Sequence, residues 1–133
     1  MAHHPAALQP PAAHLIGEVR KGFPAGRLDK MAHLLAVDRA TLLRVLGVSG
    51  RTVQRKQVLS ARLSPAASDR LSRIGRLYRL AVEVFGDGGK AAEWLKRPSR
   101  ALGRETPLGL LDTDAGAQEV EQELRQIQHG FVY

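Results

Sequence analysis

Apolar residues recur along most of this chain at the three- and four-residue spacing of helices, not at the alternation of strands. Between residues 25 and 36, for example, Leu28, Met31, Leu34 and Leu35 fall on one helical face. Strand-like alternation is missing, and the β-branched residues are scattered. The pattern therefore predicts an all-α protein.

Two short helices are predicted between residues 38 and 59. The first begins after Asp38, a good N-cap residue, and ends at Gly47. Its buried positions are Leu42, Leu43 and Leu46. Ser49 then caps the second helix, which turns Val53 inward.

The longest predicted helix begins near Pro65 and ends at Gly86. Its apolar stripe consists of Leu71, Ile74, Leu77, Tyr78, Ala81, Val82 and Phe85. A shorter helix before Pro98 offers Trp94 and Leu95 to the core. The compact turn ETPLGLLDT leads to a last helix, whose apolar positions are Ala117, Val120, Leu124 and Ile127.

The opening stretch MAHHPAALQPPAAH is rich in Ala, Pro and His and has no helical period. We therefore expect residues 1–24 to form a flexible arm. His3 and His4 could join His14 in a metal site, but their spacing does not define one, and a plain flexible tail is the alternative. We expect no metal.

Composition narrows the function classes further. The chain has no cysteine, which excludes a disulfide framework and thiol catalysis and is typical of a reducing compartment. No apolar run approaches the roughly 20 residues that span a bilayer, and no signal peptide is visible. We therefore expect a cytoplasmic protein without a membrane partner.

The net charge of +7 is unevenly distributed. Residues 1–104 hold 19 Lys/Arg and 7 Asp/Glu, a balance of +12, whereas residues 105–133 hold one Arg and 6 Asp/Glu, a balance of −5. Such a split indicates a basic surface for a polyanion and an acidic surface for another partner. Simple colloidal solubility is the alternative explanation.

The two short helices have the layout of a helix-turn-helix, in which the second helix enters the major groove of DNA. In SGRTVQRK the inward Val53 leaves a polar face outside, where Arg can pair with guanine and Gln with adenine. The expected DNA-binding residues are Ser49, Arg51, Thr52, Gln54, Arg55 and Lys56. A merely solvated basic face is the alternative.

Further cations follow at Arg62, Arg70, Arg73, Arg76 and Arg79. The last four recur every three residues, so they wrap around half of the helix and cannot all face one DNA strand. We expect Arg79 to form an ion pair with Glu83, one helical turn away.

No catalytic constellation is visible. His33 and His129 have no evident Asp or Ser partner, and GDGGK lacks the strand and the spacing of a P-loop. We therefore expect neither an enzyme nor a bound cofactor or small-molecule substrate.

From Leu63 onward the chain resembles the toxin-binding domain of the Xre/MbcA/ParS antitoxins. The matching residues are the RLS…SDRLSRI entry, a segment with Trp94, Leu95 and Pro98, the stretch ALG…TPLGLLDT, and a closing pattern. That closing pattern consists of Val120, Leu124, Ile127 and Gly130. GRTVQRK resembles the helix-turn-helix of the same family, so that the resemblance covers about residues 25 to 130.

The resemblance implies a helix-turn-helix over residues 25–62 and a toxin-binding domain over residues 63–133. Members of this family are partners of RES-domain toxins, which are similar to ADP-ribosyltransferase-type enzymes and act on NAD⁺. One part of the antitoxin binds operator DNA of its own operon, and the other neutralises the toxin. In the family the C-terminal end reaches toward the cofactor pocket of the toxin.

A pocket that holds the phosphates of NAD⁺ would be basic, and the acidic last helix, with Glu121 between two further glutamates, would be attracted to it. The expected toxin-binding residues are Glu119, Glu123, Gln126, His129, Gly130, Phe131, Val132 and Tyr133. We expect Gly130 to release the chain from helical geometry, so that the last three residues extend as an apolar plug anchored by Tyr133. For Phe131, packing back onto Leu124 or Ile127 after a glycine C-cap is the alternative.

Three functions remain distinguishable. The first is an antitoxin that also represses its operon, and the second is a stand-alone regulator with a helical dimerisation domain. The third is an antitoxin whose helix-turn-helix has lost DNA binding. Because symmetric operators require a dimer, we expect a homodimer formed through the long helix or the C-terminal domain.

Overall fold

A computed structural model of the chain describes residues 10–48 and 62–130. These residues form seven α-helices and one short 3-10 helix, which confirms the all-α prediction. The helices are α1 (Pro10–Lys21), α2 (Gly26–Leu35), α3 (Arg39–Val45), α5 (Pro65–Phe85), α6 (Gly88–Lys96), η1 (Arg100–Leu102), α7 (Pro107–Leu110) and α8 (Asp114–His129).

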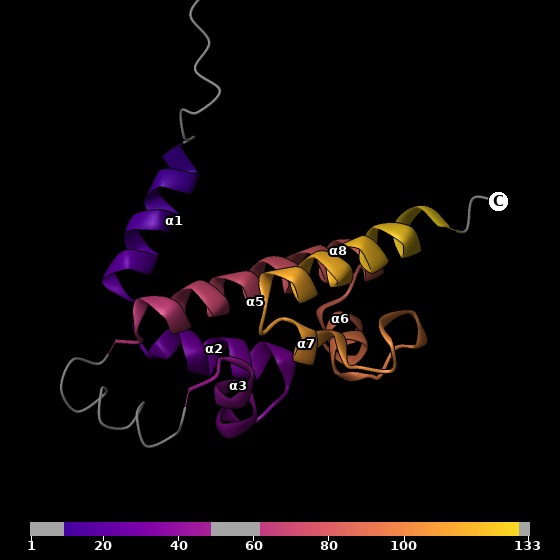
Figure 1. Ribbon diagram of the computed structural model, residues 1–133, viewed down its shortest axis with the longest axis horizontal. Coiled ribbons are helices and arrows are strands. Elements are labelled where there is room, and N and C mark those ends of the chain that lie inside the picture. Colours follow the sequence, from indigo (N-terminus) through magenta and orange to yellow (C-terminus); the bar gives the residue numbers. More distant parts are fainter. Residues whose placement is uncertain (1–9, 49–61, 131–133) are drawn as a thin grey trace, which may run out of the picture.

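The 21-residue helix α5 is the central element of the fold (Figure 1). It packs against α1, α6 and α8, while α2 contacts α3 and α6. Ser64 caps its N-terminus by accepting a hydrogen bond from the Ala67 N–H, and Pro65 occupies the first turn. Gly86 ends the helix in a left-handed conformation with a φ of 74°, as the sequence predicts.

The predicted stripe of α5 is confirmed in its centre. Leu71, Ile74, Leu77 and Ala81 are buried, and Tyr78, Val82 and Phe85 are half-buried. Leu80 is buried as well, although it lies outside the predicted stripe. Because α6 and α8 both pack along α5, its covered surface is wider than one amphipathic face.

The helix pair α2–α3 also follows the predicted pattern closely. The Asp38 Oδ1 accepts a hydrogen bond of 2.7 Å from the Thr41 N–H. Hydrogen bonding by the Thr41 side chain, together with this backbone bond, lowers the pKa of Asp38 below its usual value. The three predicted leucines of α3 are buried, and Gly47 follows with a φ of 70°. Leu34 departs from the prediction, because it is exposed while Ala32 of the same helix is buried.

The C-terminal unit is built from α6, α7 and α8. Thr113 caps α8 by accepting a hydrogen bond from the Gly116 N–H. The core of this unit contains Leu95, Leu108, Leu111, Ala117, Val120 and Leu124, all of them buried. Ile127, predicted to be apolar core, is only half-buried.

The expectation of a flexible arm over residues 1–24 is wrong for residues 10–24. Helix α1 occupies most of this stretch, and Phe23 is buried with 3% exposure. The missed signal was the helical spacing of Leu15, Ile16 and Val19 behind a proline that can start a helix.

Candidate functional site

The exposed face of α8 carries four of the predicted toxin-binding residues. Glu119, Gln126 and His129 are exposed, and Glu123 is half-buried. Their spacings of four, three and three residues place them on one side of the helix. The opposite side of α8 is fixed in the core by Ala117, Val120 and Leu124, each with 0% exposure. The face is therefore presented by a rigid helix.

The conformation of Gly130 at the end of α8 differs from the expectation that this glycine releases the chain from helical geometry. Gly130 has a φ of −75° and a ψ of −15°, a right-handed conformation, so it does not form the left-handed cap that glycine often provides. Phe131, Val132 and Tyr133 lie outside the described residues. The apolar plug that they were expected to form therefore stays a prediction.

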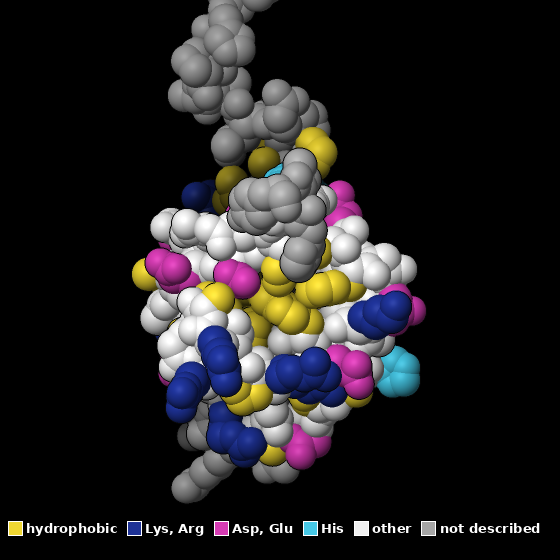
Figure 2. All heavy atoms as spheres, turned by 90° about the vertical axis from the view of Figure 1, so that its right-hand side faces the viewer, with side chains coloured by type: hydrophobic (Ala, Val, Ile, Leu, Met, Phe, Trp, Pro, Cys, Tyr) yellow, Lys and Arg dark blue, Asp and Glu magenta, His cyan; other side chains and the backbone are white. Residues whose placement is uncertain are grey.

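The end of the molecule where α8 finishes also presents apolar side chains. Figure 2 shows this face, with a central apolar area and several Lys and Arg side chains nearby. Phe85 and Trp94, at the end of α5 and in α6, pack with ring centroids 5.8 Å apart. Both rings are half-buried, so Trp94 is less enclosed than a core residue.

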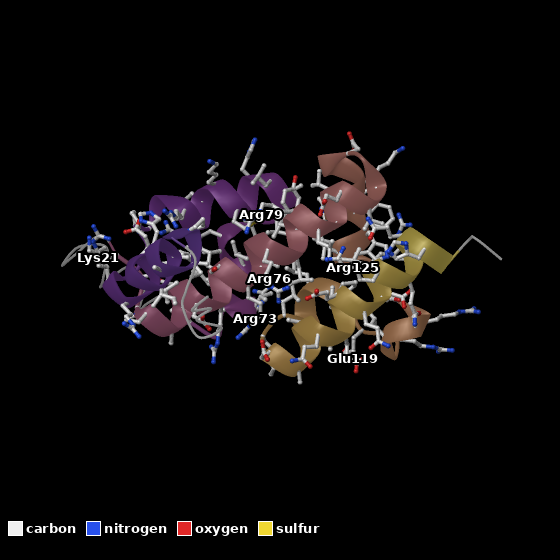
Figure 3. The ribbon with its side chains drawn as sticks, turned by 90° about the horizontal axis from the view of Figure 1, so that it is seen from above. Lys21, Arg73, Arg76, Arg79, Glu119 and Arg125 are labelled. Atoms are coloured by element: carbon white, nitrogen blue, oxygen red, sulfur yellow. The ribbon has the colours of Figure 1, made fainter. Side chains whose placement is uncertain are left out.

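Three of the four arginines of α5, expected to be part of the basic surface, form polar contacts within the chain (Figure 3). Arg70 donates a hydrogen bond of 2.7 Å to the Leu46 carbonyl, and Arg73 donates one of 3.2 Å to the Leu111 carbonyl. Arg76 forms a 2.6 Å ion pair with Glu121 of α8. These side chains tie α3 and α8 to α5 rather than facing a separate partner.

The expected ion pair between Arg79 and Glu83 is wrong, because no such pair joins these two described residues. Arg79 instead lines a groove between α1, α2 and α5. Sequence spacing predicted the pair from its own helix alone, whereas neighbouring helices decide the direction of a long side chain.

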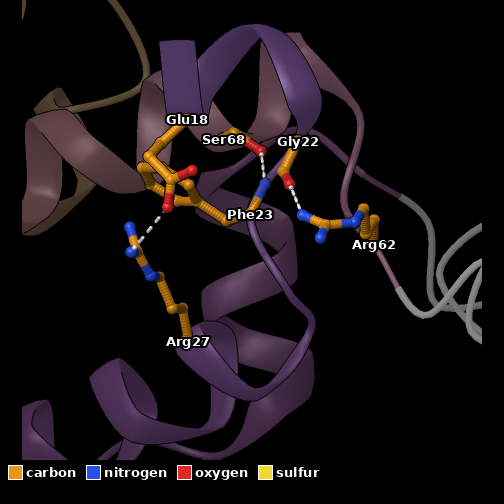
Figure 4. A network of polar contacts seen from close by, with 6 residues as sticks. All are labelled: Glu18, Gly22, Phe23, Arg27, Arg62 and Ser68. Carbon is orange, nitrogen blue, oxygen red and sulfur yellow. Dashed lines mark hydrogen bonds and ion pairs between the residues drawn. The ribbon is translucent and has the colours of Figure 1, made fainter. Parts of the chain in front are cut away.

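Arg62 likewise has an internal role, at the base of α1 (Figure 4). Its Nη1 donates a 2.7 Å hydrogen bond to the Gly22 carbonyl, and the Phe23 N–H donates one of 2.7 Å to the Oγ of the fully buried Ser68. Gly22 has a φ of 89°, and a Cβ there would lie 2.1 Å from the Leu63 carbonyl oxygen. These contacts fix the base of α1 to the start of α5.

The predicted helix-turn-helix is described in its first half only. Helix α3 and the turn at Gly47 have the expected form. The six expected DNA-binding residues all lie within residues 49–61, outside the described part of the chain. Their assignment stays a prediction.

Residues 10–48 and 62–130 contain no group of three His, Cys, Asp or Glu side chains that could hold a metal ion. His3 and His4 lie outside these residues. None of the described helices is long and apolar enough to cross a bilayer.

Two family models match the chain. Residues 14–76 match the antitoxin Xre-like helix-turn-helix domain, and residues 80–130 match the antitoxin Xre/MbcA/ParS C-terminal toxin-binding domain. Both matched regions include part of α5, the first with its beginning and the second with its end.

Curated relatives extend over most of the chain. An antitoxin Xre of Photorhabdus laumondii is 35% identical over 120 residues, which are 90% of this chain and 81% of the relative. The chain belongs to the Xre/MbcA/ParS family of antitoxins. An antitoxin Xre of Yersinia enterocolitica is 32% identical over 87% of this chain and 79% of its own. A Sphingobium protein named Prs ADP-ribosylating antitoxin is 30% identical over 86% of this chain and 78% of its own.

Membership of the family confirms the resemblance noted from the sequence and assigns each part of the fold to a domain. The antitoxin carries a helix-turn-helix domain, to which α3 belongs, and a toxin-binding domain built from the end of α5, α6, α7 and α8. The candidate functional site is thus the surface of this second domain, including the exposed face of α8.

Proposed function

We propose that this antitoxin neutralises a RES-domain toxin that consumes NAD⁺, and that it represses its own operon by binding operator DNA. The observation that carries the first part is the geometry of α8 within the matched toxin-binding domain. One side of this helix packs in the core. The other side is an acidic and polar face that extends toward the C-terminal end of the helix.

Charge supports an encounter with a basic cofactor pocket. Glu121 is engaged with Arg76, whereas Glu119 and Glu123 form no ion pair with the described residues. These two carboxylates are available to an incoming cationic surface, and complementary charge raises the association rate and selects the orientation. The end of the chain then occupies the pocket and excludes NAD⁺. Neutralisation by occlusion requires no catalytic group in the antitoxin.

The name of the Sphingobium relative is consistent with a partner of this chemistry. That protein is described as an ADP-ribosylating antitoxin, and ADP-ribosylation consumes NAD⁺. For the present chain the RES-domain toxin is the partner that this chemistry and the family resemblance together favour.

Co-purification with the product of the adjacent gene tests the proposal. We expect a stable complex, and we expect the purified toxin to consume NAD⁺ alone but not with an equimolar amount of antitoxin. If the neighbouring product neither binds the chain nor consumes NAD⁺ while the chain still binds its promoter, the protein is a stand-alone regulator instead.

Operator binding depends on the predicted recognition helix, and replacing Arg51 and Arg55 by Ala is expected to abolish specific binding. Each arginine is expected to read a guanine, and each lost bidentate contact costs about 1–3 kcal/mol of discrimination. Mobility-shift titrations at several salt concentrations measure the effect, while circular dichroism should show unchanged helicity.

A double variant with Arg20→Ala and Lys21→Ala on α1 is the matched control, because it removes the same charge outside residues 49–61. Equal losses in both double variants would show that binding is unspecific electrostatics. If the unmodified protein does not bind its promoter at all, the helix-turn-helix serves only as a scaffold.

A homodimer would match a symmetric operator, and the groove between α1, α2 and α5 is its proposed interface. Leu15 and Leu34, the two large hydrophobic side chains that are exposed in the described residues, both line it at 42% and 38% exposure. The groove has a volume of about 450 Å³, and Met31 and Tyr78 contribute to its walls. A two-fold contact through this groove would cover Leu15 and Leu34 of both copies.

Replacing Leu15 and Leu34 by Glu is therefore expected to convert a dimer into a monomer, because the change removes two apolar side chains from the contact and adds the cost of desolvating two carboxylates. Sedimentation equilibrium measures the dissociation constant. Gly17→Ala is the control, since its Cβ would meet no atom within 4 Å and the site lies away from Leu15 on α1. A double-Glu variant that dimerises like the unmodified chain would place the interface elsewhere.

A further inference from the structure

A group of cations in the toxin-binding domain has no internal role, unlike Arg70, Arg73 and Arg76 of α5. It consists of Lys90, Arg97, Arg100 and Arg104, and we call it the basic rim. All four residues are exposed, and their side chains form no ion pair or hydrogen bond with the described residues. The four positive charges of the basic rim therefore have no partner among the described residues.

The basic rim lies on α6, η1 and the turns beside them, and α6 also carries Trp94. Trp94 packs on Phe85 and both rings remain half-buried, so that part of this aromatic pair faces outward. Figure 2 shows apolar side chains in the middle of the molecule's end face, with Lys and Arg side chains mainly below them and several Asp and Glu side chains on the same face. Protein interfaces are enriched in aromatic residues and Arg, so this aromatic pair in the same unit as three exposed arginines has the composition of an interface.

The backbone at Arg104 is a second unusual feature. Arg104 has a φ of 68°, directly after Gly103 with the same φ, and its N–H donates a 2.7 Å hydrogen bond to the Ser99 carbonyl. The left-handed region favours Gly or Asn, so a long cationic side chain there is conformationally costly. Strain of this kind concentrates at sites of function. The turn holds the Arg104 side chain at the exposed edge.

We propose that the aromatic pair and the basic rim form a second docking surface for the toxin, one that contacts acidic groups outside its NAD⁺ pocket. This inference rests on the proposed function, because it names a further part of the same complex. The surface lies within residues 80–130, which match the toxin-binding domain, and α6 lies toward the same end of the molecule as the C-terminal end of α8 (Figure 1). Charge complementarity defines the partner chemistry: an apolar patch edged by Asp and Glu.

The two charged surfaces of this domain then act together. Glu119 and Glu123 on α8 meet cations, and the basic rim meets anions, so that only one orientation of the toxin satisfies both. Duplex DNA also attracts a basic loop, but it offers no apolar patch to cover Phe85 and Trp94. A protein partner therefore accounts for both the basic rim and the aromatic pair.

The test is a triple variant, Arg97→Gln, Arg100→Gln and Arg104→Asn, assayed with the purified toxin. Asn is chosen at position 104 because it tolerates the left-handed conformation. We expect toxin affinity to fall at least tenfold, mainly through a slower association rate, and its dependence on salt to become weaker. The matched control replaces the same three residues by Lys, which keeps the charge and is expected to retain most of the affinity.

Trp94 is the only tryptophan of the chain and supplies an independent readout. Incorporating 5-fluorotryptophan into the antitoxin alone gives one ¹⁹F resonance, which we expect to shift and lose its solvent isotope effect when the toxin binds. This measurement is made on the unmodified chain, so it does not depend on the folding of a variant.

Three outcomes separate the possibilities. If the unmodified antitoxin binds no toxin, the proposed function fails, and this inference with it. If it binds toxin but the triple variant binds equally well and the ¹⁹F resonance stays solvent-exposed, only the second surface is refuted. A triple variant that loses operator binding and keeps toxin binding would assign the basic rim to DNA and overturn the inference.

Discussion

An antitoxin that ends at Gly130 is expected to bind its toxin about 100-fold more weakly and to leave NAD⁺ consumption largely uninhibited. The deletion removes Phe131, Val132 and Tyr133, whose apolar and aromatic surface we propose to fill the cofactor pocket. A single aromatic anchor at the centre of an interface commonly contributes about 2–4 kcal/mol, so the loss of Tyr133 alone accounts for an effect of this size. Inhibition assays at fixed toxin concentration and titration calorimetry measure it.

The fold should survive this deletion, because the last fully buried side chain of α8 is that of Leu124. A separate Phe131→Ala variant distinguishes the two roles considered for this residue. A lower melting temperature with full inhibition would mean that Phe131 packs on its own helix, whereas weaker inhibition at an unchanged melting temperature would place it in the toxin. Truncated protein that inhibits as strongly as the complete chain would refute the plug.

Replacing Gly116 by Ala is expected to have the largest effect on stability. A Cβ at this position would lie 1.8 Å from the carbonyl oxygen of Leu110 and 2.8 Å from its carbon. Both atoms belong to the backbone at the end of α7, so no side-chain rotation can relieve the overlap. Relief requires α7 and α8 to separate, and we expect a loss of about 3 kcal/mol or more, as for severe overpacking of a core.

In thermal unfolding, this loss corresponds to a decrease in melting temperature of about 10 °C for a chain of this size. Because α8 would be displaced, toxin binding should weaken as well. Gly17→Ala is the matched control, since its Cβ meets no atom within 4 Å and alanine is the better helix former by about 1 kcal/mol. If both substitutions stabilise the protein equally, the close approach of α7 and α8 is not structurally important.

The helices that were predicted correctly are those whose local signals agree. In α5, the N-cap Ser64, the following Pro65 and the left-handed Gly86 mark the two ends, and the apolar period lies between them. In α3, the same holds for Asp38 and Gly47. Helix α1 was missed because prolines and alanines hide its weaker period, and its place depends on contacts made by Phe23 with a distant helix.

The candidate site likewise combines a feature that the sequence predicts with one that it does not. The acidic face of α8 was predictable, since residues on one helix keep their spacing in space. The basic rim could not be predicted, because in the sequence its cations do not differ from the other lysines and arginines of the first 104 residues. Only the packing of α3 and α8 on α5 shows that Arg70, Arg73 and Arg76 are engaged while others stay exposed.

The amino-acid sequence alone determined the helical class, most helix ends and the family to which this antitoxin belongs, because caps, turn glycines and apolar periods act between neighbours along the chain. The tertiary structure decided which side chains are free to meet a partner. Burial, ion pairing and the close approach of helices depend on residues far apart in the chain, as in the pairing of Arg76 with Glu121 and the hydrogen bond from Arg70 to the Leu46 carbonyl.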